Sequence, residues 1–363
     1  MDSPANPDPS FWQGRRVLLT GHTGFKGAWL SQWLTGMGAQ VTGLSLGPLE
    51  GESLWVKLGD GAVARSLTVD ICEAQATKAA IHDASPQVIL HLAAQSLVRT
   101  SFTAPLETFA TNVMGTAHVL DAARDLADCR AVVSVTSDKA YENREQIWAY
   151  REDDPMGGHD PYSASKGAAE LVTASMRRSY FEGTSTGVAS ARAGNVIGGG
   201  DWAKDRLVPD CLGAFAAGQQ VEIRNPAATR PWQHVLEPLA GYLVLAESLA
   251  DDPAEFAEGW NFGPCDDDVL PVEYIADRLV ALWGGDAGWF LTEGAHPHEA
   301  MALNVDATKA RYRLGWQPRL DLDTALQWTV DWQRGLDGGR SAADLCAEQI
   351  ARYIEIPSKR PTA

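Results

Sequence analysis

Two short runs of this chain carry groups suited to proton transfer. Thr136-Ser-Asp-Lys139 follows an apolar run, and Tyr162-Ser-Ala-Ser-Lys166 opens an amphipathic one. Residues four apart lie on one face of a helix, so an ammonium there adjoins a phenol and lowers its pKa from the usual value of about 10. Such a phenol can remove a proton from a hydroxyl group. The spacing alone is common, and a surface tyrosine with a solvated lysine is the alternative; the position of the pair in the chain favours chemistry.

The elements that must position these runs alternate between strand and helix from Arg16 to about Arg192. The apolar runs predict buried strands, the stretches between them have helical periodicity, and the order predicts a Rossmann-type, doubly wound parallel α/β sheet. The predicted strands are 17–20, 40–44, 66–69, 88–92, 131–135 and 187–191, and the predicted helices are 27–34, 73–82, 106–126 and 162–180.

Beyond Arg192 the pattern loosens, with Gly198-Gly-Gly200 and several Xaa-Pro turns. We expect a dinucleotide-binding domain over residues 11–192, with returns near 237–262, and a smaller mixed α/β lobe for substrate over 193–335. The returns are a helix at 237–249 and a strand at 260–262. Residues 1–10 and 355–363 are expected to be flexible ends.

A glycine-rich loop lies between the first predicted strand and helix. Thr20-Gly21-His-Thr-Gly24-Phe-Lys-Gly27 lets backbone amides approach a pyrophosphate at a helix N-terminus, although a tight turn alone is the alternative. The cofactor-binding residues that we predict around this loop and the neighbouring strand ends are Gly21, Thr23, Gly24, Phe25, Lys26, Gly27, Ser45, Asp70, Ile71, Leu92, Ala93, Ala94, Tyr162 and Lys166.

The second strand favours NAD over NADP. It runs Val41-Thr-Gly-Leu-Ser45-Leu-Gly-Pro48, without the acid that often binds the ribose hydroxyls and without an arginine for a 2′-phosphate. Ser45 can bond a ribose hydroxyl. Asp70 is placed to touch adenine, or equally to cap a helix.

Composition limits the partners. A net charge of −17 argues against nucleic acid and anionic membranes. No apolar run approaches the ~20 residues of a membrane span, and the five cysteines lack metal or disulfide spacing, so we expect buried thiols, no metal and a cytoplasmic protein. Several of the thirteen tryptophans, such as Trp29, Trp33 and Trp260, fall on apolar faces and are expected in the core.

Longer motifs resemble the extended short-chain dehydrogenases/reductases, and within them the nucleotide-sugar 4,6-dehydratases. The resemblance covers residues 11–332 and includes the Gly21–Gly27 loop. Relatives acting on dTDP-glucose carry Thr-Asp-Glu where this chain has Ser137-Asp138-Lys139, which is similar to the enzymes for CDP-glucose. The other motifs are Ser137–Asn143, Asp160–Lys166, Ala191–Trp202 and Arg230–Val235. The chain departs from the pattern at Ala140 and at Gln146-Ile-Trp148-Ala.

The resemblance implies a reaction. NAD takes a hydride from C4 of the sugar while Tyr162 removes the hydroxyl proton, water leaves across C5 and C6, and the hydride returns to C6. Lys166 would hold the ribose, Ser137 the C4 oxygen, and Asp138 would be the acid for the 6-hydroxyl. Lys139 would be the C5 base if burial or nearby cations keep it neutral; the alternative is a positive charge near the sugar or a salt-bridge lysine. Asn112 matches a supporting asparagine.

Other residues are expected near the nucleotide sugar. Guanidinium groups suit phosphate oxygens, although surface roles remain open for Arg206 and Arg224. Arg99 follows the fourth strand and is as readily a loop-packing residue. The substrate-binding residues that we predict are Gln95, Ser96, Asn195, Arg206, Arg224, Arg230 and His234.

The resemblance also implies an assembly, and three alternatives stay open. Relatives dimerise through the helices that correspond to 106–126 and 162–180, so we expect a homodimer or a dimer of dimers. The alternatives are an NAD-dependent nucleotide-sugar epimerase, a 4,6-dehydratase of another nucleotide sugar, and a catalytically silent dinucleotide-binding protein. The Asp138–Lys139 pair argues for dehydration over epimerisation.

Overall fold

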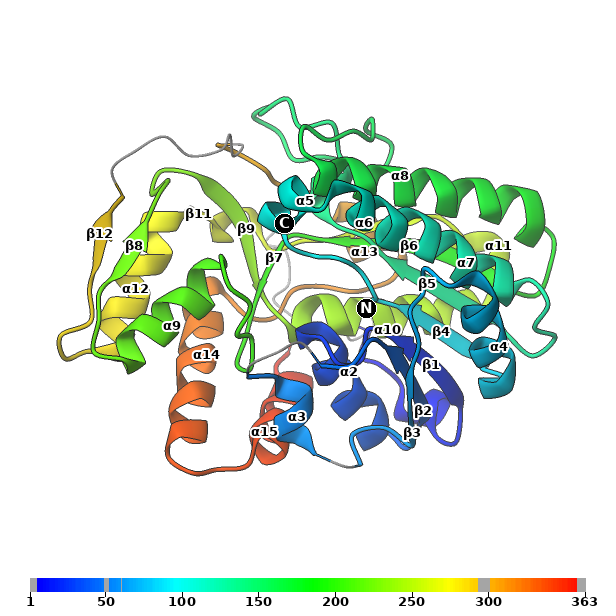
Figure 1. Cartoon of the computed structure of the whole chain (residues 1–363), viewed down its shortest axis with the longest axis horizontal. Coiled ribbons are helices and arrows are strands. Elements are labelled where there is room, and N and C mark those ends of the chain that lie inside the picture. The colour runs from blue at the N-terminus through cyan, green and yellow to red at the C-terminus, as the bar shows by residue number, and fades with distance from the viewer. Residues whose placement is uncertain (1–4, 49–51, 60, 293–300, 358–363) are drawn as a thin grey trace.

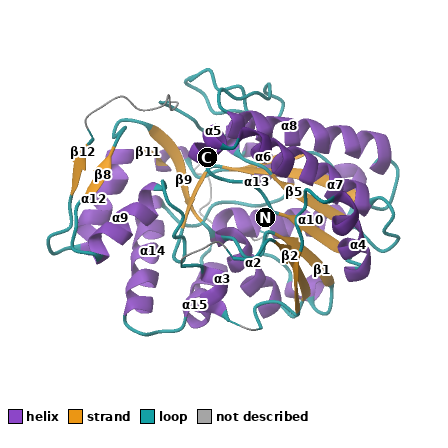
Figure 2. Cartoon of the chain, viewed as in Figure 1, coloured by secondary structure: helices purple, strands orange, loops and turns teal. Residues whose placement is uncertain are grey.

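The computed structural model describes residues 5–48, 52–59, 61–292 and 301–357. Its centre is a seven-stranded parallel sheet in the order β10-β6-β5-β4-β1-β2-β3 (Figures 1 and 2). The order reverses between β1 and β4, the point at which ligands bind in doubly wound sheets. The strands are β1 (Arg16–Thr20), β2 (Gln40–Ser45), β3 (Arg65–Thr68), β4 (Val88–His91), β5 (Ala131–Val135), β6 (Gly187–Ala193) and β10 (Gly259–Phe262).

Helices cover both faces of this sheet, which is why its central strands β4, β5 and β6 are buried along their whole length. On one face lie α4, α7 and α8, and on the other lie α2 and α10. The predicted helix 106–126 is interrupted by a π-helical turn at Ala110–Met114. The helices are α2 (Phe25–Gly36), α4 (Ala74–Ala84), α5 (Val98–Thr103), α6 (Pro105–Phe109), α7 (Gly115–Ala123), α8 (Pro161–Met176) and α10 (Leu236–Asp251), and a second π turn follows α8 at Arg177–Phe181.

A smaller mixed lobe lies beside the carboxyl ends of the strands. It contains a three-stranded sheet in the order β11-β9-β7 and a two-stranded sheet of β12 and β8. Its elements are β7 (Asn195–Ile197), β8 (Val221–Ile223), β9 (Thr229–His234), β11 (Val269–Pro271), β12 (Trp289–Leu291), α9 (Leu207–Ala216), α12 (Val272–Trp283) and α14 (Leu322–Asp337). After the first elements of this lobe the chain returns to the main sheet: β10 pairs with β6, and α10 packs in the core of the main lobe, as the sequence predicted.

The C-terminal helix returns to the main lobe. Helix α15 (Ala342–Glu355) packs against α2 and α3, and Tyr353 lies in the same core as Trp33. The remaining short helices are α1 (Pro9–Trp12), α3 (Leu54–Leu58), α11 (Pro253–Phe256) and α13 (Thr308–Arg313), with 3₁₀ turns at Asp138–Ala140 and Asp266–Asp268.

The N-terminal end differs from the expected flexible segment where it is described. Ala5 N bonds Gly315 O at 3.2 Å, and Asp8 N bonds Glu247 Oε1 at 2.9 Å. Residues 1–4 and 358–363 lie outside the described residues. Residues 5–10 are therefore anchored to the body of the protein by hydrogen bonds.

The core confirms the role predicted for Trp29, Trp33 and Trp260, which are at most 1% exposed. Of the five thiols, Cys72 and Cys265 are half-buried rather than buried. In the described ranges, no helix has the length and apolar character needed to span a membrane. The same ranges hold no cluster of three or more metal-ligating side chains.

Candidate active site

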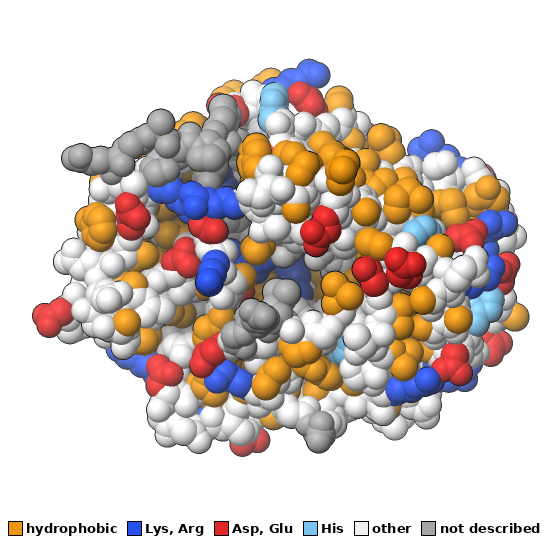
Figure 3. All heavy atoms as spheres, in the orientation of Figure 1, with side chains coloured by type: hydrophobic (Ala, Val, Ile, Leu, Met, Phe, Trp, Pro, Cys, Tyr) orange, Lys and Arg blue, Asp and Glu red, His pale blue; other side chains and the backbone are white. Residues whose placement is uncertain are grey.

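A large cavity lies between the carboxyl ends of the main sheet and the smaller lobe. Its volume is about 1710 Å³, which exceeds the 300–1,000 Å³ typical of a pocket for one small ligand and leaves room for two nucleotides. Lysine and arginine side chains gather around the hollow in the middle of the face that Figure 3 shows. The lining holds nine lysine or arginine side chains and nine carboxylates, so the cavity lacks the net negative charge of the chain as a whole.

The glycine-rich loop forms one wall of the cavity and fits a dinucleotide. A Cβ at Gly27 would stand 2.1 Å from Gly21 O, and Gly21 has φ 74° with Ala93 N 2.7 Å from its own would-be Cβ. The turn therefore requires glycine at both positions, and it brings the backbone amides at the start of α2 to the cavity. All fourteen predicted cofactor residues line this cavity.

The far end of that wall carries small polar groups and no arginine. Thr23 Oγ1 and Ser45 Oγ share a hydrogen bond of 2.7 Å, and both line the cavity at the end of β2. Asp70 Oδ1 accepts from Cys72 N at 2.9 Å, so this carboxylate supports the turn before α4. A ribose with free hydroxyls suits these partners better than a 2′-phosphate does.

Helix α8 begins where it does because Asp160 caps it. The Asp160 carboxylate accepts from Ser163 N at 2.9 Å, and Pro161 occupies the first helical position. Tyr162 is thereby fixed in the first turn, 7% exposed, with its phenol hydrogen-bonded to Ser137. Burial raises the pKa of Tyr162 to about 12. In the protein alone, burial thus outweighs the lowering that we expected from Lys166.

Lys166 lies one helical turn further along and is 5% exposed. Its Nζ donates to Val135 O at 3.5 Å. Burial lowers the pKa of Lys166 to about 8, and the negative charge of Glu170 opposes that change. Glu170 is itself held by Arg192 at 2.8 Å and by Ser190 Oγ at 2.6 Å. The negative charge of Glu170, on the same helix, therefore favours the charged form of Lys166.

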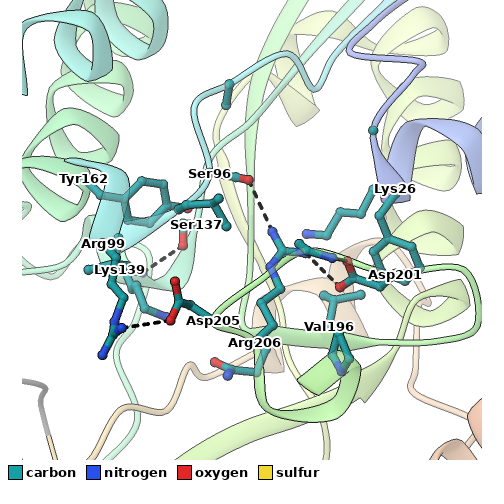
Figure 4. Close-up of a pocket in the computed structure, with 18 of the residues that line it drawn as sticks. Lys26, Ser96, Arg99, Ser137, Lys139, Tyr162, Val196, Asp201, Asp205 and Arg206 are labelled. Carbon is teal, nitrogen blue, oxygen red and sulfur yellow. Dashed lines mark hydrogen bonds and ion pairs between the residues drawn. The ribbon is translucent and has the colours of Figure 1, made fainter. Parts of the chain in front are cut away.

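The Ser137–Lys139 run lies beside the phenol in the wall of the cavity (Figure 4). Ser137 Oγ donates to Asp138 Oδ1 at 3.0 Å, and Asp138 is 1% exposed. Asp138 Oδ2 has no hydrogen-bond partner among the described residues. Lys139 Nζ lies 3.8 Å from Asp138 Oδ1, and its side chain is 30% exposed. Lys139 thus has a carboxylate neighbour and a partly exposed side chain, both of which disfavour the neutral amine that the proposed base needs.

The smaller lobe supplies the polar wall opposite the sheet. Arg206 Nη1 bonds Asp201 Oδ2 at 2.9 Å, and its Nη2 reaches Ser96 Oγ at 3.2 Å (Figure 4). Arg230 Nη1 donates to Thr229 O at 2.8 Å. The Asn195 amide oxygen is buried without a hydrogen-bond partner in the described part of the chain. Arg224 lines the same wall.

Three predicted site residues do not line the cavity. His234 is fully buried between Trp29 and Trp328, so it belongs to the core, and burial lowers its pKa to about 3. Asn112 Nδ2 and Oδ1 are used on Gln95 O, Gln95 N and Ser165 Oγ. The Gln95 side chain bonds Leu97 and Thr108. The side chains of Asn112 and Gln95 therefore form hydrogen bonds within the protein at the end of the strand.

The sequence interpretation missed several groups of the cavity. Asp201 and Asp205 pair with the arginines of the wall, and the Lys26 side chain, not only its amide, points toward Arg206 and Asp201 (Figure 4). Burial lowers the pKa of Lys26 to about 7. The signal was available, because Asp201 follows the Gly198–Gly200 turn directly after a strand. We assigned Asp201 to a motif and did not predict that it pairs with a lysine or an arginine.

The parallel sheet, the glycine-rich loop and the buried tyrosine–lysine pair define a short-chain dehydrogenase/reductase. The chain belongs to the family described as GDP-mannose 4,6 dehydratase, whose model matches residues 18–259. It is 50% identical to the CDP-glucose 4,6-dehydratase of Salmonella typhimurium, over 97% of this chain and 99% of that one. It is also 29% identical to the UDP-glucose 4-epimerase of Mycolicibacterium smegmatis, over 88% and 98%.

Solved structures share the fold. The dTDP-glucose 4,6-dehydratase DesIV of Streptomyces venezuelae, solved with NAD and TYD bound, has a TM-score of 0.75 at 24% identity and covers 90% of this chain and 99% of that one. MoeE5, in complex with UDP-glucose and NAD, has a TM-score of 0.73 at 23% identity and covers 88% and 98%. The predicted fold class and family are thereby confirmed.

Proposed function

We propose that this enzyme is an NAD-dependent dehydratase that converts CDP-glucose into CDP-4-keto-6-deoxyglucose and water. One observation carries the dehydration: the buried Asp138 carboxylate, with an unpartnered oxygen, lines the cavity that also holds Tyr162 and Lys166. With NAD as the hydride acceptor, oxidation at C4 would need only the phenol and the lysine from the protein, whereas loss of the 6-hydroxyl needs an acid. The CDP-glucose dehydratase at 50% identity supports the choice of nucleotide sugar.

The glycine-rich loop, Ser45 and Asp70 are the residues that would hold NAD. When bound, NAD accepts a hydride from the substrate and returns it, so no net oxidant is consumed. Its positively charged nicotinamide ring would be a cationic neighbour of Tyr162. That charge would favour the phenolate and so lower the pKa of the phenol from about 12. Lys166 would hydrogen-bond the ribose.

The cavity residues then divide the proton transfers. Tyr162 Oη takes the proton of the 4-hydroxyl while Ser137 Oγ holds the C4 oxygen. The ketone that results acidifies the C5 proton. Asp138 Oδ2 gives a proton to the departing 6-hydroxyl. Lys139 is the proposed base at C5, with a cation that stabilises the enolate oxygen as the alternative. On the nucleotide, Arg206, Arg224 and Arg230 would bind phosphate oxygens.

Mass spectrometry tests this function directly. Purified protein is incubated with CDP-glucose, with and without added NAD, beside dTDP-, UDP- and GDP-glucose controls. Loss of one water from CDP-glucose alone is expected. Loss of water from another sugar nucleotide instead would contradict the base preference. An isobaric product, resolved by chromatography, would favour epimerisation, which the relationship to the UDP-glucose 4-epimerase keeps as the second candidate.

The enzyme is proposed to form a homodimer through α6, the π turn and α8. Large apolar side chains on this face are exposed, which is unusual unless another protein surface covers them. These side chains, all at least 37% exposed, are Phe102, Leu106, Phe109, Met114, Leu171 and Tyr180. A dimer of dimers is the larger assembly that we propose. None of the five cysteines, all of which the structure describes, forms a disulfide, and this suits a reducing compartment such as the cytoplasm, which remains our prediction.

A further inference from the structure

A chain of ion pairs crosses the mouth of the cavity from one lobe to the other. Arg99 belongs to α5 in the main lobe, and its Nη1 lies 2.9 Å from Asp205 Oδ1 in the smaller lobe. Arg224 Nη2, after β8, lies 3.9 Å from the same oxygen. Figure 4 shows the Arg99–Asp205 pair beside Lys139 and Tyr162. Asp205 thus holds two arginines that come from opposite walls.

Asp205 is more exposed than the nearby Asp201. The Asp201 side chain is 7% exposed, and Oδ1 accepts from Ala203 N at 3.1 Å while Oδ2 holds Arg206 at 2.9 Å. The Asp205 side chain is 42% exposed, and its backbone has φ 62°, in the left-handed region that few residues other than glycine adopt. The ion pair of Asp205 is therefore partly exposed to solvent and is formed by a residue with a left-handed backbone. In the ion pair of Asp201, the carboxylate is buried in the wall of the cavity.

Asp205 adds its negative charge to a corner of the cavity that already holds the carboxylates Asp201 and Asp210. Burial, together with the negative charge of Asp205, raises the pKa of nearby Asp210 to about 6. Several carboxylates lie close together in this corner of the cavity. The guanidinium groups have the geometry to donate hydrogen bonds to phosphate oxygens instead of to these carboxylates. A diphosphate would bring two phosphate groups to the same arginines.

We propose that Asp205 is a displaceable internal anion, and that the diphosphate of a nucleotide sugar takes over Arg99 and Arg224 from it. Arg99 thereby becomes a substrate-binding residue contributed by the main lobe. Asp205 selects for ligands with two phosphates, because a single phosphate competes poorly with a carboxylate that is already in contact. This inference rests on the proposed function, since it takes a nucleoside diphosphate sugar as the ligand.

Calorimetry with CDP, CMP and ADP tests the inference without relying on turnover. Asp205→Asn keeps the size and the tolerance for φ 62° but removes the charge. We expect this variant to bind CDP roughly threefold to tenfold more tightly, because a half-exposed carboxylate no longer competes with the diphosphate for the arginines. The ratio of the CDP affinity to the CMP affinity should become smaller. Arg99→Gln should weaken CDP binding and abolish the gain from Asp205→Asn in the double variant.

Two controls separate the possible outcomes. Asp210→Asn removes one negative charge from the same corner without breaking a pair to Arg99, so it should tighten CDP binding less than Asp205→Asn does. An equal effect of both variants, or no tightening in Asp205→Asn, would overturn the displacement. ADP, as a probe of the dinucleotide half, should bind all variants alike. If the parent protein binds ADP but not CDP, the proposed function fails, and the inference fails with it.

Discussion

At the scale of single residues, the cavity is a place where burial opposes charge. It raises the pKa of Tyr162 to about 12 and lowers those of Lys166 and Lys26 to about 8 and about 7. A charged ligand in the cavity would shift the pKa of each group, because a new charge in a buried site acts strongly on its neighbours. Glu170 and the Ser137 hydroxyl oppose the effect of burial.

The phenol itself gives the first prediction. Tyr162→Phe removes the only atom proposed to take the 4-hydroxyl proton, so kcat should fall by about 10²–10⁴, the usual range for a general base. Lys166→Ala should be comparably impaired. Binding of CDP to Tyr162→Phe, measured by calorimetry, should stay close to that of the parent protein. Retention of more than a tenth of the parent kcat would remove Tyr162 as the base.

A second prediction separates the acid from the C5 base. Asp138→Asn should still oxidise C4, so that reduced cofactor accumulates and absorbs near-ultraviolet light, but water should leave slowly. Lys139→Ala should slow exchange of the C5 proton with deuterated water, because no other amine replaces it at that position. Unchanged exchange would leave Lys139 as a cation only, in keeping with its carboxylate neighbour at 3.8 Å.

The residue types and spacing predicted which side chains the fold brings together in the cavity, but not the contacts around them. Tyr162, Lys166, Ser137 and Asp138 are recognisable because a helix and a strand end fix their spacing along the chain. His234 looked polar in a motif, yet its strand turns it between two tryptophans. The ion pairs of Asp201 and Asp205 depend on how two lobes meet, which local sequence does not encode.

At the scale of elements, the break in the predicted helix 106–126 follows from one side chain. Asn112 lies in the π turn, and its amide is hydrogen-bonded to Gln95 N and O and to Ser165. An extra residue in the turn aims this side chain at the end of β4, as π turns do at functional sites. Apolar periodicity predicts the helix but cannot show the inserted residue, because both flanking segments stay helical.

Helix α2 offers a matched pair of glycines for the third prediction. Gly27→Ala places a Cβ 2.1 Å from Gly21 O, so the strand-to-helix turn must open, at a cost of about 1–3 kcal/mol, and NAD binding should weaken. Gly36→Ala, at the exposed end of the same helix, meets nothing within 4 Å and should stabilise by about 0.5–1 kcal/mol. Chemical unfolding and NAD titration measure both. Equal behaviour of the two variants would contradict a close approach at Gly27.

At the scale of the whole molecule, one buried carboxylate joins segments far apart in the chain. Glu237 on α10 accepts from Arg319 N and Leu320 N at 2.8 Å each and from Tyr353 Oη at 2.7 Å. It therefore ties the main lobe to the segment before α14 and to α15. Burial raises the pKa of Glu237 to about 7.

Stability should consequently fall with pH because of Glu237, which is the fourth prediction. The folded protein keeps this proton up to about pH 7, whereas the unfolded chain releases it near the ordinary value of 4.5. The contribution is full below pH 4.5 and is lost as the pH rises to 7. Glu237→Gln removes this dependence, so its stability relative to the parent should rise by about 3 kcal/mol between pH 4.5 and pH 7. Urea unfolding at several pH values measures it, and a constant difference would contradict the shift.

The proposed dimer gives the fifth prediction. Leu106 and Leu171 are 83% and 64% exposed on adjacent helices. Leu106→Glu combined with Leu171→Glu should convert dimer to monomer in light scattering, because two like charges would be buried on each protomer without a compensating partner. Tyr312→Glu, which alters a side chain 84% exposed on α13, is the control and should leave the mass unchanged. A monomeric parent protein would contradict the proposed interface.

The sheet edge at β10 also sets the order in which the protein can be completed during synthesis. β6 ends at Ala193, but its outer neighbour β10 begins only at Gly259, after most of the smaller lobe has been made. At about 5–20 residues per second, a ribosome leaves the buried strand β6 with an open edge for several seconds. Open edges pair readily with other chains. A shortened gene that ends at Arg192 would make that edge permanent, so the dinucleotide-binding part of this enzyme is poorly suited to production on its own.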